Sequence, residues 1–444
     1  MTSRFQLDED IDAAVKSTLF VKAPESAYQA VYSPTRQLLR RIIVEEVERE
    51  MAQLAAIQKK YRTPALDRLF VFTGMLGNHT FFLLALPFLH VFGLGLFARG
   101  LTFVVLWSVY LSGTAKDYIS APRPASPPVA QITQSPAHTL EYGFPSSHTA
   151  YVVASIAYCS YFMLGVWGTH LLWTCALWAV GLVVIVGRIY CGLHSFIDVA
   201  GGTVIGLAEA LVFIMLYDRI DALLLSAAGP LYMSVFVYTA LMAIPPSLDL
   251  CPCCIDSVCA TSVTLGLATG TWIYARLPFL WLNGHRDRIA WDSSLTLGQN
   301  LLRCLIAIAL IVAWKLASKP VMIGLAKQLF VPALDVPTTP SVGTTPCCES
   351  DTGSDTVSEL GYAQAAQDGR GFRDCDRAEV TAFIEKNYPT PSAESIKTGR
   401  YGTYEIMASP ENIARVPIYA GIGIIACAVA PVAYYYLGLL PTQQ

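Results

Sequence analysis

The chain has 444 residues, of which 54% are hydrophobic and only 14% are charged, and its mean hydropathy is +0.47. A soluble globular protein carries about 25% charged residues, so much of this chain must face lipid rather than water. The net charge of −3 excludes the basic balance of a nucleic-acid-binding protein. We therefore expect an all-α fold, a polytopic membrane helix bundle of about eight to ten spans embedded in the bilayer.

The N-terminal region, residues 1–66, is polar and lacks the charged start, short apolar core and small-residue cleavage site of a signal peptide. Within it, residues 34–60 carry apolar side chains at helical spacing and predict an amphipathic helix. Such a helix lies either on the membrane surface or against the membrane domain of its own chain, and the sequence favours neither position.

Apolar runs of about 17–22 residues follow, the length that a helix needs to cross the hydrocarbon core. We expect spans at 69–90, 97–116, 149–167, 170–187, 198–217, 228–245, 258–277, 299–317 and 416–437. Residues 320–334 are too short for a span and contain Lys327, which favours a surface or re-entrant helix, with a full span as the alternative.

Two polar interruptions divide these spans. The loop 117–148 is rich in proline and is expected to be stiff. The segment 336–413 is rich in Ser, Thr, Asp and Glu and is expected to be disordered at least in its first half. We therefore divide the rest of the chain into a core membrane domain (67–217), additional transmembrane helices (218–335), the polar loop (336–413), and a final transmembrane helix with its tail (414–444).

Four of the twelve cysteines lie together in the sequence "CPCCIDSVC", residues 251–259. They could form disulfides, carry palmitoyl groups or bind zinc. The spacing does not follow a zinc-site pattern and no histidine is near, so a cysteine-rich membrane loop is favoured over a metal site.

Ionisable residues gather at the ends of the early spans. They are Lys116, Arg123, His148, Arg188, His194 and Asp198. The second and fourth spans end at the membrane face where the third and fifth begin, so the topology brings all six residues to one face. Each alone fits an interface anchor or a packing residue, but the set on one face indicates a functional site.

The positive charges of this set suit a phosphate dianion. Arg123 and Arg188 offer planar pairs of donors, and Lys116 offers a point charge. Ser146 and Ser147 begin the third span, where they can cap the helix and add their donors to a helix N-terminus that favours anions.

The remaining residues of the set suit acid–base and nucleophilic chemistry. His148 and His194 can divide the roles of nucleophile and general acid. Asp198 follows His194 by four residues, so on a helix the carboxylate can hold one imidazole N–H and make the other nitrogen nucleophilic. No cluster with metal-ligand spacing accompanies them, and we expect neither a metal nor another cofactor.

The spacing of these residues resembles the three-part signature of the type 2 phosphatidic acid phosphatase (PAP2) superfamily of metal-independent lipid phosphatases. The matching segments are Lys116–x6–Arg123–Pro124, Pro145–Ser146–Ser147–His148 and Arg188–x5–His194–x3–Asp198. Ser147 stands where the family usually has glycine, and Gly187 where it usually has serine. The segments "KDYISAPRPASPPV", "EYGFPSSHT" and "RIYCGLHSFIDV" look like the sphingosine-1-phosphate phosphatases of the endoplasmic reticulum.

The resemblance implies a PAP2-type catalytic core in residues 67–217 and a role for each site residue. His194 would attack phosphorus and form a phosphohistidine, Asp198 would orient it, and His148 would protonate the leaving alkoxide. The phosphoryl oxygens would be held by Lys116, Arg123, Ser146, Ser147 and Arg188. The implied activity is hydrolysis of sphingoid long-chain base 1-phosphates, and the implied partners are that lipid and the membrane.

The resemblance also implies an endoplasmic reticulum membrane protein with its site in the lumen. Two spans separate the N-terminus from the site, so both are expected on one side. Lys59, Lys60, Arg62 and Arg68 precede the first span, and the positive-inside rule favours the cytosol for them. The two indications disagree, and the motifs favour the lumen.

Other functions remain open on the residues alone. One is a broader-range phosphatidate or isoprenoid-diphosphate phosphatase, and another is a lipid phosphotransferase with a histidine nucleophile. A third is a non-catalytic transporter or receptor for phosphorylated lipids, which has little use for a His–Asp pair and a second histidine.

Overall fold

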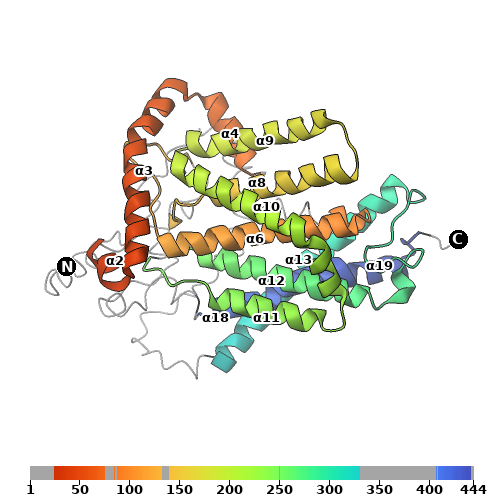
Figure 1. Ribbon diagram of the computed structural model, residues 1–444. Helices are drawn as coiled ribbons and strands as arrows, with labels where there is room; N and C mark the ends of the chain where they lie inside the picture. The colour runs from red at the N-terminus through yellow and green to blue at the C-terminus, as the bar shows by residue number, and fades with distance from the viewer. Residues whose placement is uncertain are drawn as a thin grey trace.

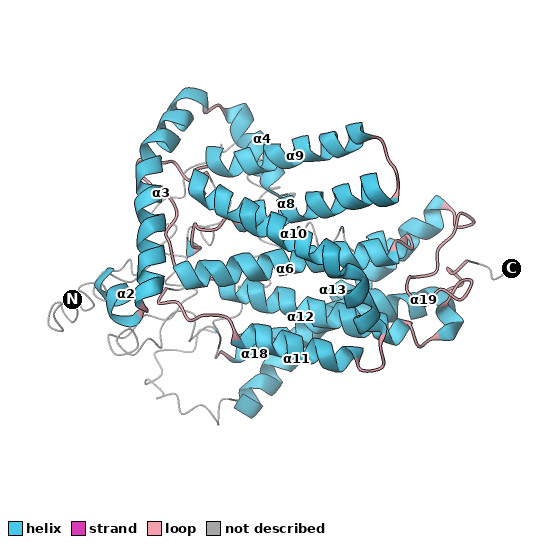
Figure 2. Ribbon diagram, in the orientation of Figure 1, coloured by secondary structure: helices cyan, strands magenta, loops and turns pink. Residues whose placement is uncertain are grey.

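Helices make up the regular structure of the computed structural model, which describes residues 25–75, 85, 88–132, 140–249, 251–330, 407 and 409–441. No β-strand occurs in these ranges (Figure 2). Seven helices in them are long and apolar enough to cross a membrane. They are α6 (Gly95–Ile119), α8 (Ser147–Tyr161, continued to Val166 by a π-helical turn), α9 (Leu171–Tyr190), α10 (Phe196–Leu225), α12 (Cys253–Tyr274), α13 (Leu297–Phe330) and α18 (Pro410–Ile424, continued to Tyr436 through a π-helical turn and α19, Ala430–Tyr436). The all-α membrane bundle expected from the composition is confirmed.

Two predicted elements differ from the structure. Helix α11 (Gly229–Met242) replaces the span expected at 228–245, and its 14 residues reach only about 21 Å, less than the hydrocarbon thickness of about 30 Å. The separate surface or re-entrant helix expected at 320–334 is wrong for the part described, because α13 continues through Pro320 to Phe330. Half of the span expected at 69–90, residues 76–84 and 86–87, lies outside the described residues. Its start belongs to α4 (Pro64–Met75).

The bundle is built around α6 and α12. Their apolar windows are 72% and 67% buried, against 28% for α9 and 22% for α10, so the first pair forms the centre and the second pair turns side chains toward lipid. Helix α8 packs against α6, α9 and α10, while α12 packs against α6, α11 and α18. Glycines allow some of these contacts, since a Cβ on Gly206 of α10 would lie 2.3 Å from the Ala150 carbonyl oxygen of α8.

One helix does not run with the bundle. Helix α3 (Pro34–Tyr61) crosses the end at which α6 finishes and α10 begins, as Figure 1 shows. Helix α13 ends and α18 begins at this same end, where Lys327 and Glu411 form an ion pair of 3.1 Å. Of the two positions expected for the 34–60 helix, the structure adopts packing against the membrane domain. We call this end of the bundle the site end.

The buried face of α3 is largely polar because it packs on helix ends, whose last carbonyls lack partners within their own helix. Arg36 donates to the carbonyl oxygens of Tyr118 (2.5 Å) and Asp117 (2.7 Å) at the end of α6. Gln58 donates to the carbonyl oxygens of Ala130 (2.7 Å) and Tyr190 (3.0 Å) and accepts from the Ala130 amide (2.8 Å). Apolar side chains face outward instead, at Leu38, Leu39 and Ile42.

Replacing Gln58 with alanine is expected to lower the free energy of unfolding by about 3 kcal/mol. The change leaves buried backbone groups of Ala130 and Tyr190 without their partner, at about 1–3 kcal/mol for each such group. Thermal unfolding in detergent measures the effect. The exposed Gln53 of the same helix supplies the matched control, Gln53→Ala, for which we expect about 0.5 kcal/mol or less. Equal melting temperatures for both variants would contradict an anchoring role for Gln58.

Candidate active site

The six ionisable residues predicted from the span ends come together at the site end of the bundle. Lys116 lies in the last turn of α6, and Arg188 lies in the last turn of α9. His148 is the second residue of α8, while Asp198 lies in the first turn of α10. Arg123 and His194 lie in the loops that follow α6 and α9. Four helix ends therefore build the site, as the alternation of the spans predicts (Figure 1).

The geometry around His194 defines which nitrogen carries the proton. Its Nδ1 lies 3.5 Å from Asp198 Oδ2, and its Nε2 lies 3.2 Å from Arg123 Nη1. A guanidinium only donates hydrogen bonds, so the Nε2 beside it must be the acceptor and the proton belongs on Nδ1, toward the carboxylate. Arg123 Nη1 is itself held by the Leu193 carbonyl oxygen at 2.7 Å. The arrangement leaves the Nε2 lone pair directed at the guanidinium of Arg123.

The electrostatic environment keeps this imidazole neutral. Burial lowers the pKa of His194 well below its ordinary value, and the charges of Arg123 and Arg188 lower it further. His194 is 1% exposed, so little solvent reaches it. A neutral imidazole retains the lone pair that nucleophilic attack requires.

A helix cap fixes the carboxylate that faces His194. Ser195 is the N-cap of α10, and its hydroxyl accepts from the Asp198 amide at 3.4 Å. In return, Asp198 Oδ2 accepts from the Ser195 amide at 2.8 Å, which completes a capping box. The Asp198 carbonyl oxygen also accepts from the Ser146 amide at 2.9 Å. The second and third signature segments are thereby joined by one main-chain hydrogen bond.

Residues 146–148 begin α8 as predicted from the sequence. Ser146 is the N-cap, and its hydroxyl oxygen accepts from the Thr149 amide (3.4 Å) and the Thr149 hydroxyl (3.0 Å). Ser147 and His148 are half-buried, and the His148 ring packs against Tyr151 with ring centroids 5.2 Å apart. The positive charge of His148, when present, is among those that lower the pKa of His194.

A residue that the sequence analysis did not single out, Glu141, lies among the cations. Its Oε2 accepts from Lys116 Nζ at 3.1 Å and from Arg123 Nη2 at 2.9 Å. The side chains of both cations are 3% exposed, whereas that of Glu141 is 21% exposed. The available signal was an acidic residue seven positions before His148, in a stretch that is otherwise uncharged back to Arg123.

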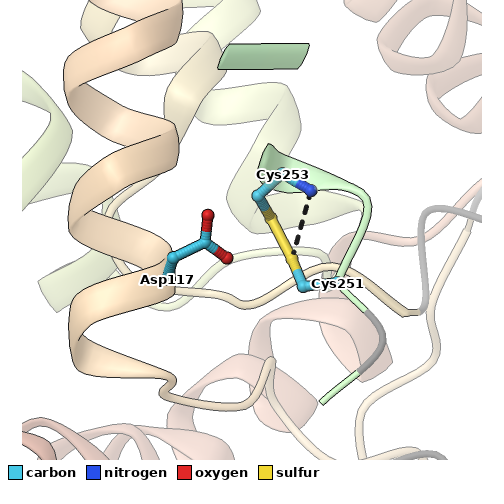
Figure 3. Close-up of side chains that lie close together, drawn as sticks. All are labelled: Asp117, Cys251 and Cys253. Carbon is cyan, nitrogen blue, oxygen red and sulfur yellow. Dashed lines mark hydrogen bonds between the residues drawn. A yellow bond between two sulfur atoms is a disulfide. The ribbon is translucent and has the colours of Figure 1, made fainter. Parts of the chain in front are cut away.

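The cysteine segment lies beside the end of α6, against Asp117. Figure 3 shows Cys251 and Cys253 joined as a disulfide beside the Asp117 carboxylate, and the ligand atoms of the three residues lie within 4.8 Å of one another. Of the three possibilities raised for this segment, the structure adopts the disulfide. Because a thiolate is the form of cysteine that binds zinc, the bonded pair does not fit a metal site.

Comparison with known proteins agrees with this site. The PAP2 superfamily model matches residues 97–221, which contain every predicted site residue. A dihydrosphingosine 1-phosphate phosphatase of Schizosaccharomyces pombe is 28% identical over 408 residues, covering 88% of this chain and 89% of that protein. One from Saccharomyces cerevisiae is 32% identical over 305 residues, covering 66% and 72%. Sphingosine-1-phosphate phosphatase 1 of Rattus norvegicus is 33% identical over 192 residues, 41% of each chain. No solved structure matches this chain.

The fold and the matched segment define a membrane phosphatase of the PAP2 class. The similarity to the two yeast proteins extends over most of their length and identifies a branch within this class. This chain belongs to the sphingoid base 1-phosphate phosphatase branch of the PAP2 superfamily, and the resemblance inferred from the motifs is confirmed.

Replacing Asp198 with asparagine is expected to lower the kcat of phosphate release by about 10²–10⁴-fold while the protein stays folded. Asparagine keeps an acceptor for the Ser195 amide but removes the negative charge that faces His194 Nδ1. Steady-state kinetics and thermal unfolding of the purified protein measure the two effects. The control is Ser195→Ala, which removes the other half of the capping box and costs about 1 kcal/mol of stability. A kcat for Asp198→Asn that is no lower than that of Ser195→Ala would mean that Asp198 acts only as a cap.

Proposed function

We propose that this protein hydrolyses the 1-phosphates of sphingoid long-chain bases at the membrane and releases the free base and inorganic phosphate. The observation that carries the proposal is the neutral His194, with Nδ1 toward Asp198 and Nε2 toward the guanidinium of Arg123. Binding alone would need the cations but not an oriented imidazole. The named activities of the yeast and rat relatives supply the substrate class.

The proposed reaction has two steps. In the first, His194 Nε2 attacks phosphorus, the bond from phosphorus to the lipid oxygen breaks, and His148 gives its proton to the leaving alkoxide. In the second, His148 takes a proton from water, whose oxygen attacks the phosphohistidine and returns His194 with inorganic phosphate. Asp198 stabilises the charge that develops on the imidazole in each step.

The cations and the start of α8 hold the transferring phosphoryl group. Arg123 and Arg188 offer paired donors, Lys116 offers a point charge, and each acts at a buried position where charge is weakly screened. Ser146 and Ser147 supply the N-terminus of α8, which favours an anion. These groups would stabilise the negative charge that spreads over the equatorial oxygens in the transition state.

The protein is a multi-pass membrane protein, and we propose that it resides in the endoplasmic reticulum with its site toward the lumen. Helix α3 carries Lys59 and Lys60 at the site end, so these basic residues and the site share one side of the membrane. A glycosylation sequon added to the exposed loop at 283–287, at the other end of the bundle, measures the side. Glycan attached there in microsomes would contradict a lumenal site.

The decisive measurement is release of inorganic phosphate by the purified protein in detergent with EDTA. The panel contains a sphingoid base 1-phosphate, phosphatidate, lysophosphatidate and an isoprenoid diphosphate. We expect the highest kcat/KM for the first, and a loss of at least about 10³-fold in His194→Ala. Activity lost in EDTA and restored by magnesium would reject metal-free chemistry. Binding without release from any lipid would favour a transporter or receptor.

The role of His148 is tested by the leaving group. His148→Ala is expected to lose about 10²–10⁴-fold in kcat with a lipid alkoxide, which needs a proton to depart. With p-nitrophenyl phosphate, whose phenolate leaves without a proton, formation of the phosphoenzyme should be largely restored. Rapid-quench trapping of the phosphoenzyme with both substrates separates this step from hydrolysis. An equal loss with both substrates would contradict a general acid at position 148.

A further inference from the structure

The carboxylate of Glu141 lies among the cations that are expected to bind phosphate. A phosphate is negatively charged, so its binding calls for positive charge at this position and not for a carboxylate. A single oxygen, Oε2, lies 3.1 Å from Lys116 Nζ and 2.9 Å from Arg123 Nη2. Both cations are the ones expected to bind the phosphoryl oxygens, and both are buried. A substrate phosphate must therefore enter beside this carboxylate or displace it.

The position of the carboxylate indicates what kind of phosphate the site accommodates. Lys116 and Arg123 both contact the same oxygen of Glu141. An alkyl phosphate dianion that reaches these two cations would lie beside a like charge. A headgroup that carries an ammonium group next to its phosphate would offer the carboxylate a partner of opposite charge.

The local energetics favour the same headgroup. A carboxylate about 4 Å from a phosphate oxygen is repelled by roughly 4 kcal/mol per pair of charges at an effective dielectric constant of about 20. An ammonium group between them replaces this repulsion with two attractions. In a sphingoid base 1-phosphate the amine is on the carbon next to the one that carries the phosphate ester. The two charges of the headgroup are therefore neighbours, as Glu141 and the cation pair are.

We propose that Glu141 binds the ammonium group of the substrate headgroup, while Lys116 and Arg123 exchange its carboxylate for phosphoryl oxygens. In the substrate-free protein the same carboxylate keeps the two buried cations paired. The inference rests on the proposed function and adds its basis of selectivity: an amine-bearing phosphate is accepted over an alkyl phosphate or a phosphatidate.

The test compares two substrates in Glu141→Gln and in the unaltered protein. One is a sphingoid base 1-phosphate, and the other is a straight-chain alkyl phosphate of the same length without the amine. We expect Glu141→Gln to lower kcat/KM about 10–100-fold for the first, the effect of losing a charged partner, and to leave or raise it for the second. Glu141→Asp, which keeps the charge, should recover part of the preference. The control is Glu48→Gln on the exposed face of α3, which should leave the ratio unchanged.

Other outcomes would overturn the inference. Equal losses with both substrates would mean that Glu141 acts only by positioning Lys116 and Arg123, and equal gains would mean that it only holds the place of the phosphate. If Glu141→Gln does not fold, the unaltered protein still tests the inference. Similar kcat/KM values for the two substrates would exclude an ammonium site. If the unaltered protein releases phosphate from neither, the proposed function fails; if it hydrolyses both and Glu141→Gln keeps the ratio, only the inference fails.

Discussion

The site depends on the N-terminal cap of α10. Asp198 closes the capping box with Ser195, its carbonyl oxygen accepts the Ser146 amide, and its carboxylate faces His194. One residue therefore fixes the start of α10, joins it to the start of α8 and orients the imidazole. A cap on a buried helix end restricts the carboxylate, because a movement of Oδ2 would leave the Ser195 amide without its partner. The residue proposed to orient the imidazole is therefore also the residue that caps α10.

The second constraint is the burial of like charges. Lys116, Arg123 and Arg188 are each less than a tenth exposed and lie near one another. Such a cluster costs free energy unless anions accompany it. Asp198 and Glu141 provide them in the substrate-free protein, and a phosphate would provide more in the complex. The protein thus holds the cations that we propose to bind phosphate in a paired arrangement, as preorganised electrostatic stabilisation requires.

Much of this arrangement follows from the sequence. Span lengths and their alternation place six residues from four helix ends on one face. The position of Glu141 in the site could not be predicted from the sequence. Its contact with Lys116 depends on the path of a loop and not on helical periodicity. The length of α11 and the course of α13 through Pro320 also could not be predicted, since hydropathy locates an apolar run but not the residue at which a helix ends. The polar buried face of α3 could not be predicted for a related reason. A hydropathy pattern identifies the buried face of a helix only where the partner surface is apolar, whereas α3 packs on helix ends.

A site built on helix ends depends on the relative positions of the helices along their axes. In lipid, no hydrophobic driving force holds helices against one another. Helix α3 supplies a restraint. Arg36 binds the end of α6, Gln58 binds the end of α9, and the Glu50 carboxylate accepts the Ile197 amide of α10 at 3.2 Å. These three contacts lie on one helix, so a shift of α6, α9 or α10 by a fraction of a turn would break one of these hydrogen bonds. The helix ends from which the site is built are therefore joined by a helix that contributes none of the predicted catalytic residues.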